Sequence, residues 1–326
     1  MNQYNILLVG AGELGSRYLQ GLKSVDVKIK IYVSEPNLDN RMLAQKRFDE
    51  IPDNNNVKGI LFIDDIDLID DDIDLAIVAT SSQVRFSLTK RLINETKVKF
   101  LILEKVLFQK VNEYDIISSL LVKNNVKCWV NHTRRVYPFY NTVKKSIKDK
   151  SQICFTAQGG GWGLACNALH FIDLFSFLSD SQDLIINTSL IENKVYKSKR
   201  DDFIEFNGSI VGMIGQNQFF INSFDKHVPI VISIMSEDYL YIIDEDFERF
   251  EIRKKDDNWI GNSFSEKIVY FQSEITHIII QEILVNGDSS LPSYSESANH
   301  HKIFISSLLK KYNNILGTDN YSMPIT

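Results

Sequence analysis

Three glycines near the N-terminus constrain what this chain can fold into. Gly10, Gly12 and Gly15 form a G-x-G-x-x-G run directly behind the apolar stretch Ile6 to Val9. The first glycine permits a sharp turn, the second lets backbone approach a pyrophosphate, and the third lets the next helix close on the sheet. The N–H groups that open this helix would then face the phosphates. The run therefore predicts a dinucleotide site behind the first strand.

An acidic residue follows at the distance that such a site requires. Glu35 lies twenty positions after Gly15 and directly follows the β-rich run 30–34. Its carboxylate is expected at a strand end, where it can accept both hydroxyls of an adenosine ribose and would repel a 2′-phosphate. The pattern favours NAD(H) over NADP(H), and Arg41 and Arg47 nearby keep the second cofactor open.

The composition is that of an ordinary globular protein with room for two domains. The 326 residues are 44% hydrophobic and 24% charged, and the net charge is −6. Because basic residues are scattered, nucleic acid and anionic membranes are not expected partners. Apolar runs stay well below the roughly twenty residues of a membrane span, and no signal peptide precedes the first strand, so a cytoplasmic location is expected. Cys128, Cys154 and Cys166 form no C-x-x-C pair and are expected to be reduced.

The fold expected is α/β: an N-terminal Rossmann domain with a parallel sheet over residues 1–125, then an α/β domain over residues 126–326. The first part alternates short apolar runs with helical patterns, which is typical of a parallel sheet covered by helices. Its predicted strands are Ile6 to Val9, Ile29 to Val33, Ile60 to Ile63, Leu75 to Ala79 and Phe100 to Leu103.

The second part is rich in β signals and predicts a large, mainly antiparallel open sheet. Its predicted strands are Val126 to Asn131, Ile153 to Gln158, Asp183 to Ile191, Asp202 to Asn207, Ser209 to Ile214, Gln218 to Ser223, Val228 to Ser236, Tyr239 to Asp244 and Phe247 to Ile252. Its predicted helices are Arg134 to Ile147 with Pro138 in the first turn, Ala165 to Leu178, Ser273 to Val285 and Ser295 to Leu316.

A run of aspartates between residues 64 and 74 invites a metal interpretation. It lacks the glycine and the terminal glutamate of a calcium-binding loop. We therefore expect a solvated turn before the next strand and no metal site.

Two side chains are candidates for chemistry. Lys105 follows Glu104 at the end of a predicted parallel strand, where an ammonium can stabilise an alkoxide that forms beside a nicotinamide. His170 lies on a predicted helix with Asn167 three positions before it and Asp173 three positions after, so the three share one face. A neighbouring carboxylate fixes the tautomer of an imidazole and suits it to act as general base for an alcohol proton. The alternatives are a surface lysine and a satisfied core histidine.

In this order the motifs resemble one known family. The segments are Val9 to Gly15, Glu104-Lys105, Asn131 to Arg135 with Pro138, Gly161-Trp162-Gly163-Leu164, His170 to Asp173, Leu291 to Tyr294 with Glu296, and His301-Lys302. They look like the Gfo/Idh/MocA oxidoreductases, the superfamily of glucose-fructose oxidoreductase and inositol dehydrogenase. The likeness spans essentially the whole chain.

The resemblance implies an NAD-dependent dehydrogenase or reductase of a sugar, nucleotide sugar or cyclitol, assembled as a homodimer or homotetramer. Lys105 would be the active-site lysine and His170, with Asp173, the group that exchanges the hydroxyl proton. Candidates for gripping the substrate are Arg134, Arg135, Trp162, Asn167 and His170. The expected cofactor contacts are Gly10, Gly12, Glu13, Leu14, Gly15, Glu35, Thr80, Ser81, Glu104 and Lys105.

The chain departs from the family pattern in two places. Val106 stands where the family usually has a proline after the lysine, and Cys166 stands where an aspartate commonly precedes the histidine by four residues. Asn167 or Asp173 is expected to supply the polar partner of His170 instead. The departures leave two other functions open. One is a noncatalytic NAD-binding regulator or sensor, and the other is a reductase of an imine or a linear pyrrole.

Overall fold

The structure is a computed structural model that describes residues 3–147 and 151–326. By their contacts, these residues form two compact units. The first unit contains Met1–Phe108, Asn112–Asn131 and Tyr270–Ser295, and the second contains Gln109–Val111, His132–Val269 and Glu296–Thr326. The units interleave along the chain, whereas the sequence suggested one division between residues 125 and 126. The division into domains of residues 1–125 and 126–326 stays a prediction.

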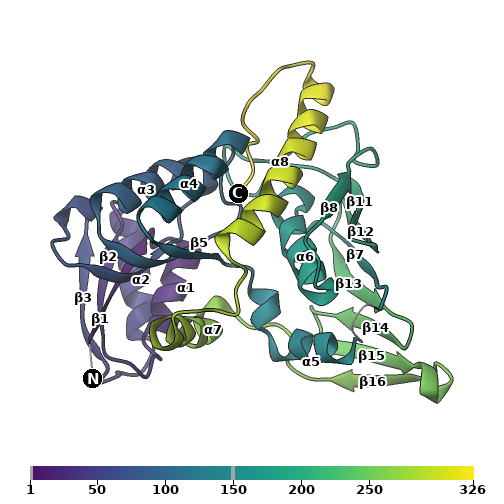
Figure 1. Cartoon of the computed structure of the whole chain (residues 1–326), viewed down its shortest axis with the longest axis horizontal. Helices are drawn as coiled ribbons and strands as arrows, with labels where there is room; N and C mark the ends of the chain where they lie inside the picture. The colour runs from purple at the N-terminus through teal and green to yellow at the C-terminus, as the bar shows by residue number, and fades with distance from the viewer. Residues whose placement is uncertain (1–2, 148–150) are drawn as a thin grey trace. The chain divides into compact units, whose positions relative to one another are not determined.

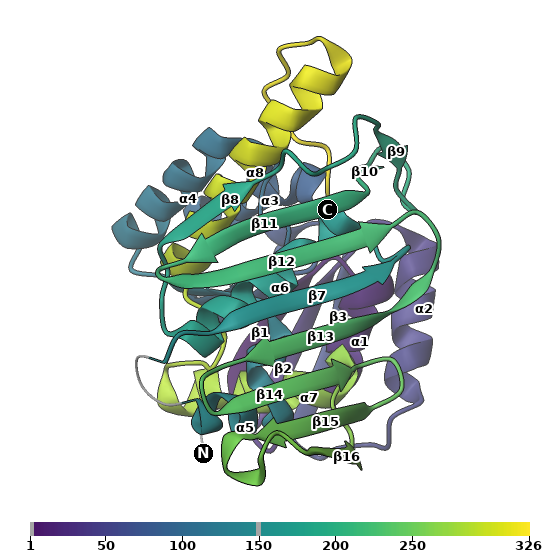
Figure 2. The ribbon, with the colours of Figure 1, turned by 90° about the vertical axis from the view of Figure 1, so that its right-hand side faces the viewer.

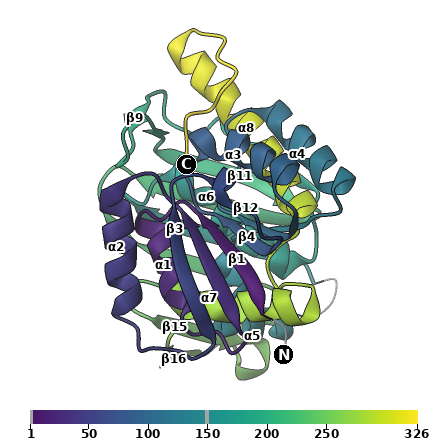
Figure 3. The ribbon, with the colours of Figure 1, turned by 90° about the vertical axis from the view of Figure 1, so that its left-hand side faces the viewer.

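A six-stranded parallel sheet forms the centre of the first unit, in the order β3-β2-β1-β4-β5-β6 (Figures 1 and 3). Its strands are β1 (Tyr4–Val9), β2 (Ile29–Ser34), β3 (Val57–Ile63), β4 (Ile73–Val78), β5 (Val98–Leu103) and β6 (Lys127–Val130). The order reverses between β1 and β4, and ligands of such sheets bind at this point, outside the carboxyl ends of the strands. The predicted Rossmann sheet is confirmed.

Helices connect these strands and cover the sheet. They are α1 (Glu13–Leu22), α2 (Leu38–Asp49), the 3₁₀ helix η1 (Ile66–Leu68), α3 (Ser82–Glu95), α4 (Val111–Lys123) and, later in the chain, α7 (Gln272–Gln281) with the π-helical turn η4 (Glu282–Asn286). The buried residues of α1 include Tyr18 and Leu22, as the apolar spacing of this segment predicts.

The second unit is built on an eight-stranded sheet in the order β16-β15-β14-β13-β7-β12-β11-β8 (Figure 2). Every neighbouring pair is antiparallel except β7 and β12, so the predicted mainly antiparallel sheet is confirmed. The strands are β7 (Cys154–Gly160), β8 (Leu184–Asn187), β11 (Gly208–Ile214), β12 (Asn217–Phe224), β13 (Val228–Met235), β14 (Tyr239–Asp244), β15 (Arg249–Lys254) and β16 (Gly261–Ser265).

The remaining elements of this unit frame the sheet. They are the 3₁₀ helix η2 (Thr133–Val136), α5 (Pro138–Ser146), α6 (Leu164–Ser179), the short ribbon of β9 (Tyr196–Lys197) and β10 (Ile204–Glu205), the 3₁₀ helix η3 (Lys255–Asp257) and α8 (Tyr294–Leu316). Most of α6 is buried, and the helix packs on β12 and β11. It therefore forms the core of the second unit together with the sheet.

Several predicted boundaries differ from the structure for physical reasons. The strand predicted over Val126 to Asn131 is β6, which pairs with β5 in the first sheet instead of joining the second part of the chain. The helix predicted to start at Arg134 starts at Pro138, because the residue before a proline is driven out of the α region, and Tyr137 is extended with ψ 130°. The strand predicted over Asp183 to Ile191 stops at Asn187, and Ile191 makes only an isolated bridge to Gly208.

None of the helices within 3–147 and 151–326 combines the length and the apolar character that crossing a bilayer demands. The aspartate run forms ion pairs: Asp71 pairs with Lys30, Asp72 with Lys97, and Asp65 and Asp67 with Arg91. Within the same ranges, no three His, Cys, Asp or Glu side chains are grouped so that they could hold a metal ion.

Candidate functional site

The glycine run forms the turn between β1 and α1. Gly10 has φ +87°, and a Cβ there would lie 2.8 Å from the Thr80 side chain. A Cβ on Gly15 would lie 2.0 Å from the Gly10 carbonyl oxygen, so the third glycine is required for the helix to close on the turn. Gly12 differs, because the nearest atom to its Cβ position is the Asn40 side-chain nitrogen at 3.9 Å. The middle glycine thus faces open space, as close approach of a pyrophosphate requires.

The start of α1 suits an anion. The helix begins at Glu13, and its N-cap, Gly12, provides no side-chain acceptor for the first-turn N–H groups. These groups carry the positive end of the helix dipole. The Glu13 carboxylate accepts two hydrogen bonds from Arg47. Glu13 and Leu14 would therefore contact a phosphate through their backbone N–H groups. The residues present therefore fit the pyrophosphate of a dinucleotide.

Glu35 is held directly behind the glycine turn. It follows the last residue of β2, and its side chain is buried. One carboxylate oxygen accepts from the Ala11 backbone N–H at 2.8 Å and the other from the Asn37 N–H at 3.0 Å. Because an ionised carboxylate has about four acceptor positions, each oxygen can still accept a ribose hydroxyl.

Arg41 and Arg47, the two arginines that left NADP(H) as an alternative cofactor, are both paired with carboxylates. Arg47 makes two hydrogen bonds to Glu13, at 2.9 and 2.8 Å. Arg41 bonds to the Glu35 carbonyl and to the Asp64 carboxylate. Their charges are balanced by neighbouring carboxylates, and the buried Glu35 carboxylate would repel a 2′-phosphate. The geometry of the first unit thus favours NAD(H).

A buried network fixes the residue before Lys105. One oxygen of the Glu104 carboxylate accepts from the Tyr18 hydroxyl at 2.6 Å and from the Asn131 side-chain amide at 2.6 Å. Asn131 also donates to Gln272 of α7 at 2.8 Å. Burial and the Glu104 carboxylate raise the pKa of Tyr18 well above its usual value, so the phenol stays a donor. Glu104 thereby ties the end of β5 to α1, β6 and α7.

Hydrogen bonds from Arg85 also fix the segment after Glu104. Arg85 of α3 is 2% exposed and donates to the carbonyl oxygens of Thr80, Val106 and Leu107. Thr80 and Ser81 follow β4, and Ser81 is the N-cap of α3. The peptide bond between Lys105 and Val106 is cis. Lys105 itself is half-buried at the carboxyl end of β5, on the sheet edge that carries the glycine turn.

In the second unit, α6 carries one polar stripe on an otherwise apolar helix. Cys166, His170 and Asp173 are spaced i, i+4 and i+7, which places them on one face. The ring of His170 lies edge-on to the ring of His132, with the centroids 5.5 Å apart. His170 is half-buried, so its imidazole combines a protein contact with partial access to solvent.

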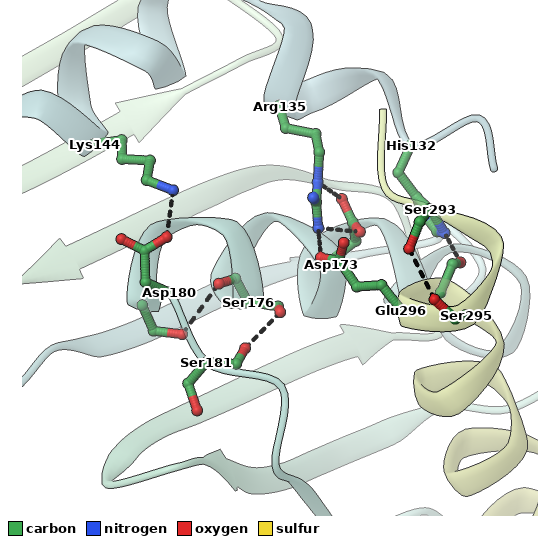
Figure 4. A network of polar contacts seen from close by, with 12 residues as sticks. His132, Arg135, Lys144, Asp173, Ser176, Asp180, Ser181, Ser293, Ser295 and Glu296 are labelled. Atoms are coloured by element: carbon green, nitrogen blue, oxygen red, sulfur yellow. Dashed lines mark hydrogen bonds and ion pairs between the residues drawn. The ribbon is translucent and has the colours of Figure 1, made fainter. Parts of the chain in front are cut away.

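Asp173 forms a buried ion pair (Figure 4). Its two oxygens accept from Arg135 at 2.9 and 2.7 Å, and Arg135 also donates to Glu296 of α8 at 2.7 Å. Burial raises the pKa of Asp173, and the attraction of Arg135 opposes that rise. The structure thus shows Asp173 and Arg135 hydrogen-bonded to each other. The predicted action of Asp173 on His170 and the predicted contact of Arg135 with the substrate stay predictions.

A hydrogen-bonded chain adjoins the His132 ring. His132 Nε2 lies 3.1 Å from the Ser297 hydroxyl, which lies 3.2 Å from His301 Nδ1. His301 Nδ1 is also 2.8 Å from the Ser297 carbonyl oxygen, a contact that needs a proton on that nitrogen. The chain connects η2 with the start of α8 in the second unit.

Arg134, Trp162 and Asn167 lie near the same stretch of α6. Arg134 makes a two-bond ion pair with Glu245, at 2.9 and 2.6 Å. Burial opposes its charge, but attraction to Glu245 outweighs burial and raises the pKa of Arg134. The Trp162 indole donates to the Asn222 carbonyl at 3.1 Å, and the Asn167 amide donates to the Trp162 carbonyl at 2.5 Å.

The structure thus gathers the predicted cofactor residues in the first unit, and places His170, Asp173, Arg134, Arg135, Trp162 and Asn167 in the second. The sequence reasoning missed the groups that hold these residues in place. They are Arg85, His132, Glu205, Glu245 and Glu296. Glu296 and His132 stood inside the motif segments and could have been singled out as buried polar residues, whereas Glu205 belongs to no motif.

Comparison with known proteins agrees with this fold. Residues 4–132 match the model of the oxidoreductase family GFO_IDH_MocA, described as an NAD-binding Rossmann fold. No curated protein matches the sequence significantly.

Among solved structures, a Gfo/Idh/MocA family oxidoreductase from Vibrio cholerae is 13% identical, with a TM-score of 0.69 over 97% of this chain and 100% of that one. A levoglucosan dehydrogenase solved with NADH and levoglucosan is 13% identical, with a TM-score of 0.70 over 96% and 98%. A super-repressor mutant of Gal80p from Saccharomyces cerevisiae is 13% identical, with a TM-score of 0.71 over 97% of each chain. Residues 4–132 thus form an NAD-binding Rossmann domain that matches this oxidoreductase family, and the chain as a whole shares its fold with these solved structures.

Proposed function

We propose that the protein is an NAD(H)-dependent oxidoreductase that passes hydride between the nicotinamide and a carbinol or keto carbon of a sugar, nucleotide sugar or cyclitol. One observation carries the proposal. The buried bonds of Glu104 to Tyr18 and Asn131 fix the end of β5, so Lys105 lies at the same sheet edge as the glycine turn. An ammonium held there suits a charge that develops on a substrate oxygen.

The roles follow from the chemistry of alcohol oxidation. NAD, when bound, supplies the acceptor for the hydride that leaves the carbinol carbon with both electrons of its C–H bond. His170 takes the hydroxyl proton as the C=O bond forms, and Lys105 stabilises the alkoxide character of that oxygen. In reduction His170 returns the proton. Asp173 would act on His170 through the helix face that they share.

Substrate contacts are proposed for the four residues around α6. Trp162 and Asn167 are half-buried, so the indole can offer an apolar face to a sugar ring and the amide can meet a hydroxyl. Arg134 and Arg135 are held by Glu245 and Asp173, and we propose that they shape the wall of the substrate site through these ion pairs.

The test is turnover by the full chain. Purified protein is mixed with NAD and a panel of sugars, nucleotide sugars and cyclitols, and NADH absorbance is followed. We expect one class to react, and Lys105→Ala to lower kcat by about 100-fold or more. Lys99→Ala is the matched control, because Lys99 is an exposed lysine of β5, the strand that ends two residues before Lys105. Absence of turnover with the whole panel, together with tight NAD binding, would contradict the proposal.

That outcome would favour the second candidate, a noncatalytic NAD-binding regulator or sensor. Two observations support it. The fold is shared with a Gal80p super-repressor mutant, and Cys166 stands where the family commonly has an aspartate. Adding a cyclic imine and a linear tetrapyrrole with NADH to the panel tests the remaining alternative, an imine or linear-pyrrole reductase.

We also propose that the chain assembles as a homodimer or homotetramer. Exposed apolar side chains of the eight-stranded sheet support this, namely Ile185, Phe224, Val231 and Met235. The last two alternate along β13 with the buried Ile232 and Ile234, so they lie on the opposite face of that strand. Light scattering coupled to gel filtration would show a mass of two or four chains, and a monomer at micromolar concentration would contradict it.

A further inference from the structure

The first turn of α6 is held by a carboxylate that comes from another element. Glu205 lies on β10, and its oxygens accept from the backbone N–H groups of Ala165 at 2.8 Å and Cys166 at 3.2 Å. Its own neighbour Phe206 donates a third bond at 3.3 Å. The Cys166 side chain is hydrogen-bonded to the same carboxylate. Glu205 therefore caps the helix and touches the first member of its polar stripe.

The backbone in front of the helix is shaped around this carboxylate. Gly163, the N-cap residue of α6, has φ +80°. A Cβ on Gly163 would lie 2.7 Å from a Glu205 oxygen and 3.3 Å from the Asn167 side-chain nitrogen. A side chain at this position would displace Glu205, so the glycine and the carboxylate depend on each other.

Two carboxylates thus contact α6, one before and one after His170 along the helix. Asp173, after it, is paired with the Arg135 guanidinium through two hydrogen bonds. Glu205, before it, is bonded to backbone N–H groups and a thiol. Burial raises the pKa of Glu205, and these hydrogen bonds oppose the rise. Within the described ranges, Asp173 is paired with a guanidinium, whereas the partners of Glu205 are backbone N–H groups and a thiol. The negative charge of Glu205 is therefore not balanced by a guanidinium.

The geometry points to Glu205 as the positioning residue for His170. The inference rests on the proposed function and, beyond the resemblance, adds Glu205 at the start of α6 to the action proposed for Asp173 three residues after His170. Side chains at i and i+4 of a helix lie about 6 Å apart at their Cβ atoms, so the carboxylate on Cys166 is one turn from the imidazole. It fixes the helix that carries the imidazole, and its negative charge favours the imidazolium that forms when His170 takes a proton.

Other titratable and charged groups surround this stretch of α6, and the test must separate them from Glu205. They are His132, Arg134 and Arg135 of the segment before α5, Cys166 and Asp173 of α6, Glu245, which pairs with Arg134, and Glu296, His300 and His301 of α8. A variant that changes only Glu205 leaves all of these in place.

The experiment compares wild type, Glu205→Gln and Glu192→Gln, all saturated with NAD. Glu192 is the matched control, because it is an exposed glutamate of the same unit that bonds to the Tyr196 hydroxyl. The pKa of the His170 imidazole is measured by NMR on labelled histidines, with the resonance assigned in a His170→Asn variant. We expect Glu205→Gln to lower this pKa by about 0.5–1 unit and the control to leave it unchanged.

Turnover with the substrate found in the panel is the second readout. We expect Glu205→Gln to lower kcat by about 10- to 100-fold, with the Kd for NAD within about twofold of wild type. Cys166→Asp in the Glu205→Gln background returns a carboxylate to the first turn of α6, and we expect it to restore most of kcat.

An unchanged imidazole pKa in Glu205→Gln would overturn the proposal, as would a fall in kcat that only follows the loss of folded protein by circular dichroism. The NMR readout needs no substrate. It therefore decides the role of Glu205 even if wild type proves unable to transfer hydride, which would be a failure of the proposed function alone.

Discussion

At the residue scale, we propose that Glu35 determines which cofactor the glycine turn accepts. Its buried carboxylate is aimed by the Ala11 and Asn37 N–H groups, so replacing it alters both the ribose contact and the turn. Asp64 and Glu13 hold the two nearby arginines, which leaves Glu35 as the group that decides against a 2′-phosphate.

We expect Glu35→Gln to weaken NAD binding by about 10- to 100-fold, because charge-assisted hydrogen bonds to the ribose are lost. Calorimetric titration with NAD and NADP measures this. Glu95→Gln is the control, because Glu95 is an exposed residue of α3 paired with Arg91. Equal NAD affinity in wild type and Glu35→Gln would show that the carboxylate does not hold the ribose.

His300 gives the stability of the fold a dependence on pH. It is buried on α8, and burial lowers its pKa below the usual 6.5, although Asp173 and Glu296 oppose the shift. Above about pH 6.5 both folded and unfolded chains carry the neutral ring. Below it the unfolded chain takes the proton first, so stability is lost as the pH falls towards the lowered pKa of the folded state.

We expect His300→Gln to lose less stability than wild type between pH 7.5 and 5.5. The difference should not exceed about 1.4 kcal/mol, the value for one proton over one pH unit. Urea unfolding at both pH values measures it, with His227→Gln as the exposed control. Parallel pH profiles of His300→Gln and wild type would refute the assignment.

At the scale of elements, two glycines in the turn from β1 to α1 differ in whether the fold itself excludes a side chain. Gly15 is needed by the fold, because its Cβ position lies 2.0 Å from the Gly10 carbonyl oxygen. The Cβ position of Gly12 meets nothing closer than 3.9 Å, so the fold tolerates a side chain there, and we propose that the ligand is what requires this glycine.

We therefore expect Gly15→Ala to lower the free energy of unfolding by about 1–3 kcal/mol or more. Gly12→Ala should fold with a change within about 0.5 kcal/mol and yet bind NAD at least about tenfold more weakly. Urea unfolding and calorimetry give the two quantities. Gly59→Ala, with no atom within 4 Å of its Cβ position, is the control. Full NAD affinity in Gly12→Ala would contradict the placement of the pyrophosphate.

The elements that the sequence predicts well are those with strong local patterns. The apolar runs of β1, β4 and β5 and the glycine turn that leads into α1 follow from their own residues. β16 was missed because its five residues are all exposed and mostly polar, so it has no apolar alternation. The two-residue ribbon of β9 and β10 is too short to show a period.

At the scale of the whole molecule, sequence reasoning fails where a partner is distant in the chain. β6 was assigned to the second part of the chain because its sequence does not state that it pairs with β5. Glu205 was missed for the same reason, because forty positions separate it from Ala165 and no motif contains it. Conversely, Lys105 and His170 were singled out because each stands in a recognisable local segment, and their roles stay predictions.

The central proposal is that Lys105 and His170 act on one oxygen of one substrate. A crystal structure of the full chain with NAD and a sugar selected from the panel tests it most directly. We predict that the Lys105 ammonium and the His170 imidazole both lie within about 2.6–3.2 Å of the same sugar hydroxyl, beside the nicotinamide. The two side chains facing different cavities would contradict the account.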